Sequence, residues 1–354
     1  MTISPDTIST QYLMNSLVLP ATQAQTALTT AMTEETTGQY ADLGLQLGDQ
    51  SGYELSLKEQ VQQLQALTAG NGLVSTNLST AQDALTAISS TAQSTLSDVI
   101  AWSPSGNSGA VLQSTGQAAL QGLIASTNAS SGDEYVFGGI NSSVAPMADY
   151  YSTPASAAQT AVDDAFQTTF GFLPTDPAAA GITAAQMQSF LSGPYAALFS
   201  GSNWSSDWSS ASSVNATAEI APGQTVETST NANQPAFQDL AQAYTMLSEF
   251  GGSQLSADAQ QAVASAATSL ITQGQDSLTD MQASLGATQS AVTDANNAMN
   301  SQLTLLQQQV NGLDDVNQDA TATQITSLTN QIQMAYELTS RLQQLNLAQY
   351  LPVP

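Results

Sequence analysis

The chain has no cysteine, no histidine and only two basic residues, and each of these absences excludes a class of function. Without cysteine there are no disulfides and no thiol nucleophiles, and without histidine the usual zinc sites and histidine-based catalytic triads are excluded. Lys58 and Arg341 are the only cations against 28 acidic residues, so the net charge is −26. Such a charge repels nucleic acid and anionic lipid surfaces. We therefore expect no enzyme, no cofactor or metal, and no nucleic-acid partner.

Charged and aromatic side chains are also scarce, at 8% and 6% of the 354 residues. The apolar residues are mostly Ala, Leu, Val and Ile, which suit close packing of helices better than a bulky globular core. No apolar run reaches the length that a membrane-spanning helix needs, so no membrane insertion is expected. The N-terminal stretch lacks a basic segment followed by an apolar one, so the sequence predicts no cleaved secretory signal.

The last predicted helix, Thr323–Leu351, carries an apolar stripe that nothing on the same segment covers. The stripe recurs at steps of three and four, which predicts one helical face made of Ile325, Leu328, Ile332, Ala335, Leu338, Leu342 and Leu345. The opposite face is Gln, Thr, Ser and Asn, with almost no charge. We predict that this stripe packs on a matching helix of the same chain and on copies of the chain in an assembly.

Two much longer helical patterns occupy the two halves of the chain, at residues 53–101 and 256–313. In the first, apolar residues from Val74 onward alternate steps of four and three, which is the heptad of a coiled coil. Gly70-Asn71-Gly72 is a local weak point inside this pattern, and Ser256 is a predicted N-cap for the second pattern. Shorter helices are predicted at about 8–19, with Pro20 as an interruption or kink, and at 21–36, 110–127 and 235–250.

Residues 142–230 differ in kind from the rest of the chain, because they hold half of the prolines, Trp204 and Trp208, and several serine-rich runs. The stretch EIAPGQTVE at 219–227 predicts a β-hairpin around a Pro-Gly turn. Just before this region, the stretch GDEYVFGG at 132–139 changes from helical to strand and turn chemistry. We interpret the region as a separate, exposed insert of mixed α and β structure.

The resulting layout is mirror-like and predicts a mainly α fold, a long antiparallel coiled-coil or bundle core with paired terminal helices. We predict a terminal helical domain at 1–36 with 320–354, a long-helix core at 37–141 with 235–319, and a small outward α/β insert at 142–234. The two long seams can cover each other only if the chain folds back on itself, which brings both ends together.

Few residue groups in the chain point to a small-molecule site. Asp315, Asn317 and Asp319 have the alternate spacing of a calcium loop, but Ala320 and Thr326 stand where that loop needs Gly and Glu, so helix capping is favoured. Acidic pairs such as Asp163-Asp164 fit a solvated surface in so acidic a chain. Trp204 and Trp208 could stack on a sugar, but anchoring the core of the insert is favoured.

Four stretches resemble the flagellin superfamily and, more narrowly, the hook-associated protein 3 family of its alphaproteobacterial branch. They are the N-terminal helix, the connector TTGQYADLGLQLGDQSG at 36–52, the GDEYVFGG element with Tyr135, Phe137, Gly138 and Gly139, and the C-terminal segment 313–351 with Tyr336 to Leu342 at its centre. The similarity covers about 1–141 and 235–354, and the insert matches nothing that we can name. Gln39 stands where that family often has Arg or Lys.

This resemblance implies a structural protein of the bacterial flagellum, exported through the flagellar type III apparatus and assembled helically where hook meets filament. It implies an extracellular location, and as partners copies of itself, a neighbouring hook-associated protein, flagellin, and an export chaperone at the C-terminal region. The predicted assembly interface is Ile8, Tyr12, Leu17, Ile325, Leu328, Ile332, Leu338, Arg341, Leu342 and Leu345. Two alternatives stay open: a filament flagellin, and a cell-surface protein that binds carbohydrate through Trp204 and Trp208.

Overall fold

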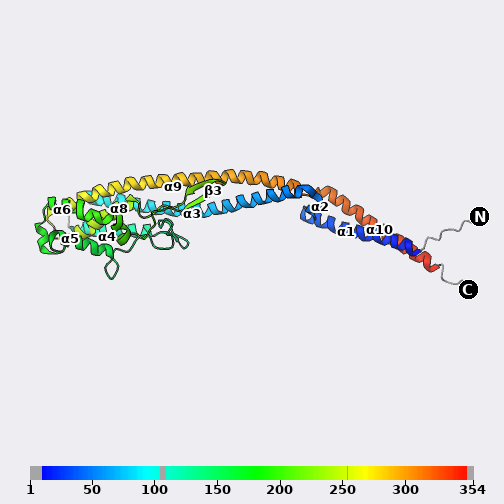
Figure 1. Cartoon of the computed structure of the whole chain (residues 1–354), viewed down its shortest axis with the longest axis horizontal. Helices are drawn as coiled ribbons and strands as arrows, with labels where there is room; N and C mark the ends of the chain where they lie inside the picture. The colour runs from blue at the N-terminus through cyan, green and yellow to red at the C-terminus, as the bar shows by residue number, and fades with distance from the viewer. Residues whose placement is uncertain (1–9, 104–108, 253, 349–354) are drawn as a thin grey trace, which may run out of the picture. The chain divides into compact units, whose positions relative to one another are not determined.

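The computed structural model describes residues 10–103, 109–252 and 254–348 (Figure 1). The chain forms two compact units, and the first of them is built from two stretches far apart in the sequence. Unit 1 takes its residues from 1–64 and 301–354, and unit 2 is the continuous stretch Gln65–Asn300. The sequence SPSGNSG at 103–109 predicts a turn, and most of it lies outside the described residues.

Unit 1 is built of helices whose small and branched apolar side chains meet along narrow seams. Its elements are α1 (Thr10–Thr37), α2 (Leu43–Leu47), the short η1 (Gly48–Gln50), the start of α3 (Ser51–Ala101), the end of α9 (Ala257–Asp314) and α10 (Gln318–Ala348). α1 and α10 pack against each other and run antiparallel, with Gln25 bonded to Tyr336 and Gly38 close to Gln318. On α1 the facing residues are Ala21, Ala24, Leu28 and Ala31, which have the spacing of a coiled-coil seam.

α1 continues as one helix through Pro20, so of the two predicted alternatives, an interruption or a kink, the interruption is wrong. Proline removes one backbone donor, crowds the preceding turn and disfavours the helical conformation of the residue before it. The Thr22 hydroxyl donates to the carbonyl oxygens of Val18 and Leu19, both at 2.9 Å, directly beside the proline. Packing on α10 from Ala21 onward then outweighs the single lost bond.

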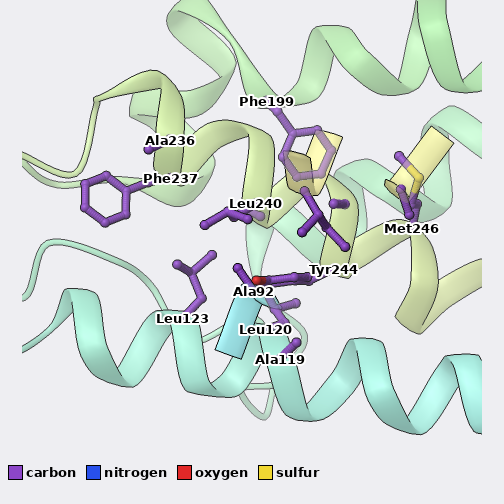
Figure 2. Packing of buried hydrophobic residues seen from close by; sticks show 14 of the residues in the cluster. Ala92, Ala119, Leu120, Leu123, Phe199, Ala236, Phe237, Leu240, Tyr244 and Met246 are labelled. Carbon is purple, nitrogen blue, oxygen red and sulfur yellow. The ribbon is translucent and has the colours of Figure 1, made fainter. Parts of the chain in front are cut away.

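Unit 2 is organised around the antiparallel pair of α3 and α9. Asn71 of α3 is bonded to Asn296 of α9, and further along α3 Gln82 is bonded to the backbone of Gln282. α4 (Gly109–Thr127) packs on α8 (Pro235–Phe250), and Figure 2 shows Leu120 and Leu123 of α4 facing α8. Ser256 caps α9 as predicted, since its hydroxyl accepts from the amide of Ala259 at 3.3 Å.

The remaining part of unit 2, residues 142–234, consists of short elements around aromatic side chains. They are α5 (Ala157–Phe170), η2 (Pro177–Gly181), α6 (Ala184–Phe190), η3 (Leu191–Tyr195), η4 (Ala196–Phe199), α7 (Gly201–Asn203), η5 (Trp204–Trp208), β3 (Thr217–Ala221) and β4 (Gln224–Glu227). Phe166, Phe190 and Tyr195 surround Phe250 of α8, with ring centroids 5.4–5.7 Å away. This segment therefore shares one hydrophobic core with the helices.

The only sheets in the described residues are two short antiparallel pairs. β1 (Ser130–Ser131) pairs with β2 (Glu134–Tyr135), and β3 pairs with β4 around a turn in which Gly223 has a φ of 77°. The second pair is the hairpin predicted at 219–227. The predicted fold class, mainly helical with a small mixed insert, is thus confirmed.

Candidate assembly surface

Exposed apolar side chains concentrate in unit 1, although it has half as many residues as unit 2. Among the described residues, ten of the seventeen exposed large hydrophobic side chains belong to unit 1: Val18, Leu19, Met32, Leu45, Tyr53, Leu55, Leu305, Met334, Tyr336 and Leu338. Their exposed fractions run from 51% to 85%. A group of this size on a small helical unit marks a surface that another molecule covers.

The apolar stripe predicted on α10 divides into two faces. Ile325 and Leu328 are half-buried and Ile332 is 9% exposed, so these three pack within the chain. Leu338 is 51% exposed, and half-buried Thr339 takes the next position of the seam instead. The reason is the heptad: the seam runs with steps of four and three, and Leu338 comes one residue too early to stay on it.

Met334 and Leu338 therefore form a second apolar edge of α10, away from the seam. They stand four residues apart, so their side chains are neighbours on one side of the helix. Arg341 is exposed one turn further along. Of the other predicted interface residues, Ile8 lies outside the described residues, as do the side chains of Tyr12, Leu17, Leu342 and Leu345.

The terminal helices carry almost no charge along this surface. Residues 10–33 of α1 and 320–336 of α10 contain no Asp, Glu, Lys or Arg. Threonine hydroxyls on α1 donate to carbonyl oxygens one turn earlier, as Thr26 does to Thr22 and Thr29 to Gln25. Hydroxyls satisfied in this way need little further hydration, so covering the surface costs few hydrogen bonds to water.

Sequence comparisons match the N-terminal and the C-terminal part of the chain to models of one protein family. Residues 8–142 match the family model described as bacterial flagellin N-terminal helical region, and residues 257–351 match bacterial flagellin C-terminal helical region. Together the two matches cover about two thirds of the chain, in the order that one family has them. The chain belongs to the flagellin superfamily. This superfamily consists of structural proteins of the bacterial flagellum that assemble with one another.

A structural comparison agrees on the fold of this flagellin-superfamily chain. A candidate flagellar hook-associated protein from Vibrio parahaemolyticus superimposes with a TM-score of 0.50 at 14% sequence identity. The match covers 75% of this chain and 97% of the other. No curated protein sequence matches the chain. Among the described residues no helix is long and apolar enough to cross a membrane.

The GDEYVFGG element holds together the two ends of the 142–234 segment. The backbone oxygen of Phe137 accepts from Ala232 at 2.9 Å, and that of Gly138 accepts from Ser212 at 3.0 Å. The Phe137 ring is fully buried against Phe237 of α8, with ring centroids 5.3 Å apart. Tyr135 contributes through its backbone, because its amide donates to the oxygen of Ser142 at 2.8 Å.

Gly138 and Gly139, the last two glycines of this element, occupy places that a side chain could not. A Cβ on Gly138 would lie 2.7 Å from the oxygen of Asn141. Gly139 has a φ of 61°, and a Cβ there would lie 2.5 Å from the oxygen of Ser212 and 2.6 Å from that of Val214. The element is therefore the root of the segment, and its four motif residues act through packing and backbone geometry.

Trp204 and Trp208 belong to the core, as the favoured prediction had them. Each is 1% exposed, and their rings stack with centroids 5.7 Å apart. Trp208 also stacks on Tyr150 at 5.3 Å, and the Trp204 indole donates to Asn233 at 3.0 Å. Neither ring has a free face for a sugar.

The acidic stretch at 314–319 caps a helix. The Asn317 side-chain oxygen accepts from the amide of Ala320 at 3.1 Å, so α10 begins at Gln318, five residues before the predicted start. Among the described residues no group of three or more acidic side chains is arranged to hold a metal ion. Capping was the favoured prediction, and the hydrogen bond confirms it.

Two functional residues escaped the sequence analysis. Asn71, taken there as a weak point, is 1% exposed and donates to the oxygen of Ile220 at 2.7 Å and to Asn296 at 2.8 Å. The signal was its place in the heptad, seven residues after Leu64 and seven before Leu78, both of which are buried. Lys58 forms ion pairs with Glu54 and with Asp314. Only the first partner, one helical turn away, has a signal in the sequence.

Proposed function

We propose that this flagellin-superfamily chain is a subunit of the hook–filament junction, of the hook-associated protein 3 type and the alphaproteobacterial branch. The observation that carries the proposal is the set of ten large hydrophobic side chains exposed on unit 1, whose terminal helices have no charged residue over 10–33 and 320–336. Neighbouring copies would cover this surface in a helical array, since a head-to-tail contact that does not close on itself propagates. The GDEYVFGG element and the C-terminal segment favour the junction type.

We assign a separate role in the assembly to each region of the chain. Residues 1–36 with 320–354 form the inner assembly domain, 37–141 with 235–319 form the surrounding long-helix core, and 142–234 face outward. Met334 and Leu338 supply part of the contact between copies, and Arg341 pairs with an acidic residue of a neighbour. The partners are copies of the chain, another hook-associated protein on one side and flagellin on the other.

Export precedes assembly in this proposal. The chain passes through the flagellar type III apparatus, with a chaperone on the C-terminal region, and ends outside the cell. Two features support this: the chain has no disulfide to form after passage, and its apolar terminal surface needs cover before assembly.

A filament flagellin is the second candidate, because the superfamily assignment fits it equally. The structural relative is described as hook-associated, but at 14% identity its likeness shows the fold alone and does not decide between the two candidates. The carbohydrate-binding alternative loses its support, since Trp204 and Trp208 are buried.

Localisation combined with a surface substitution tests the proposal in the bacterium that carries the gene. Gold-labelled antibody should mark one narrow band between hook and filament by electron microscopy. The double variant Met334→Ser/Leu338→Ser should reduce that label at least tenfold, because burying those side chains contributes roughly 2 kcal/mol or more per contact. Gln331→Ser/Gln333→Ser, on exposed polar positions of the same helix, is the matched control and should keep the label.

Each other outcome of this experiment is informative. Label along the whole filament would identify a filament flagellin, and absence of label from the flagellum would refute both structural candidates. Full incorporation of the Met334→Ser/Leu338→Ser variant would show that this edge of α10 is not a contact between copies.

A further inference from the structure

Four helices of unit 1 meet where two connectors lie side by side. One connector follows α1 and the other joins α9 to α10. The amide of Tyr40 donates to the oxygen of Asp314 at 2.9 Å, and that of Val316 donates to the oxygen of Gly38 at 2.9 Å. Between them Gln39 and Asp315 form an antiparallel bridge. We call this meeting of the two connectors the joint. In the part of the chain that the structure describes, these two are the backbone hydrogen bonds between the connectors.

Lys58 of α3 adds the one ionic contact to this joint. Its Nζ lies 2.7 Å from Oδ2 of Asp314, the last residue of α9, and it also pairs with Glu54 on its own helix. Asp314 thus binds α3 through its carboxylate and the connector after α1 through its backbone oxygen. A single residue therefore links α3, α9 and the strand-like connector that begins at Gly38.

No other group can replace Lys58 at this position. Asp314 is 1% exposed, and its Oδ1 is buried without a hydrogen-bond partner in the described structure. It stands at the C-terminal end of α9, where the helix dipole is negative, and Asp315 follows directly. Arg341, the only other cation of the chain, stands near the far end of α10.

We propose that Lys58 and Asp314 form an ionic lock that fixes the α1–α10 pair on the ends of α3 and α9. The lock determines the direction in which the terminal helices leave the long ones, and so how the apolar surface is presented. Its consequence for assembly rests on the proposed function, whereas the lock itself is measured in the isolated full-length chain. Failure of one is therefore distinguishable from failure of the other.

The physical basis is the burial of the two acidic partners, since the side chains of Asp314 and Glu54 are 1% and 10% exposed and that of Lys58 is 39% exposed. Removing Lys58 leaves both buried carboxylates without their cation, whereas removing Asp314 as well leaves only Glu54 unpaired. Lys58→Met should thus loosen the joint strongly. Lys58→Met/Asp314→Asn should restore much of the loss, and Lys58→Arg should keep the joint closed.

Hydrogen exchange at the amides of Tyr40 and Val316 reads out the joint directly, because their bonds close it. We expect Lys58→Met to speed their exchange at least tenfold and the double variant to recover at least half of that change on a logarithmic scale. Asp319→Asn, which removes an exposed charge in the first turn of α10, is the matched control and should stay within twofold of wild type. Circular dichroism should show equal helix content in all variants.

Three results would overturn the lock. The first is unchanged exchange in Lys58→Met, and the second is a double variant no slower than Lys58→Met. The third is exchange of both amides in the wild-type chain at the rate of an unfolded peptide. That result would mean that the ion pair does not keep the joint closed.

Discussion

Gly132 and Gly139 share a left-handed backbone conformation, each with a φ of 61°, but their surroundings differ. A Cβ at Gly132 would meet nothing within 4 Å, whereas at Gly139 it would meet two backbone oxygens at 2.5 and 2.6 Å. Gly132→Ala should therefore lower the free energy of unfolding by about 1–2 kcal/mol, which is the cost of the left-handed backbone conformation for a residue with a Cβ. Gly139→Ala adds a clash with backbone atoms that cannot move freely. We expect this variant to lower the free energy of unfolding by about 2–4 kcal/mol in total.

Urea unfolding followed by tryptophan fluorescence measures this difference, because Trp102, Trp204 and Trp208 are all buried in unit 2. The comparison with Gly132→Ala separates conformational strain from crowding at the root of the 142–234 segment. Equal losses in the two variants would mean that the root tolerates a side chain, and that the glycine is required for its φ alone.

At the scale of elements, Asn71 ties three of them together. Its amide group bonds to Asn296 of α9 and to the backbone of Ile220 in β3, inside a seam that is mostly apolar. A buried asparagine in a coiled-coil seam specifies register at some cost in stability. Here it also holds the hairpin β3–β4 on the helix pair.

Asn71→Ala should destabilise unit 2 by about 1–3 kcal/mol, because two buried acceptors lose their donor. The amides of β3 should exchange faster than those of α4, which does not depend on this contact. Asn77→Ala, six residues further along the same helix and only half-buried, should change stability by less than about 0.5 kcal/mol. Unchanged exchange in the hairpin of Asn71→Ala would show that Asn71 does not anchor it.

Local periodicity predicted the elements well and the contacts between them poorly. The long helices, the hairpin at 219–227 and the Ser256 cap follow from patterns within a few residues, and the structure has them. The pairing of Lys58 with Asp314 joins residues 256 positions apart, so no local pattern contains it. The interruption predicted at Pro20 failed for the same reason, since packing on α10 decides the outcome there.

At the scale of the whole molecule, acidic charge is distributed with almost no compensation. Residues 65–300 contain 17 acidic side chains and no basic one, so no ion pair within unit 2 can lower its repulsion. Some of these carboxylates are also withdrawn from water. Burial raises the pKa of Glu249 and of Asp239, and burial together with the neighbouring Asp164 raises that of Asp163.

The sign of the resulting pH dependence is opposite to ordinary acid denaturation. A carboxyl whose pKa is higher in the folded state binds its proton more tightly there, so folding takes up protons and stability rises as the pH falls. Burial is the main cause of the raised pKa of Glu249, the neighbouring Tyr150 hydroxyl opposes it, and repulsion from Asp163 adds to it. The gain in the free energy of unfolding should appear at a pH below neutrality and above the ordinary carboxyl pKa of about 4. It is lost as the pH rises through the raised pKa values of the buried carboxyls.

We therefore expect the urea midpoint of unit 2, followed by tryptophan fluorescence, to be higher at pH 5.5 than at pH 7.5. Protonation also reduces the mutual repulsion of the 17 acidic groups, which acts in the same direction. Glu249→Gln should raise the midpoint at pH 7.5 and flatten the pH dependence, whereas the exposed Asp294→Asn should leave the slope as it is. A midpoint that falls between pH 7.5 and 5.5 would mean that carboxylates stabilised by the fold outweigh the buried ones, and the assignment of Glu249, Asp163 and Asp239 as the dominant groups would be wrong.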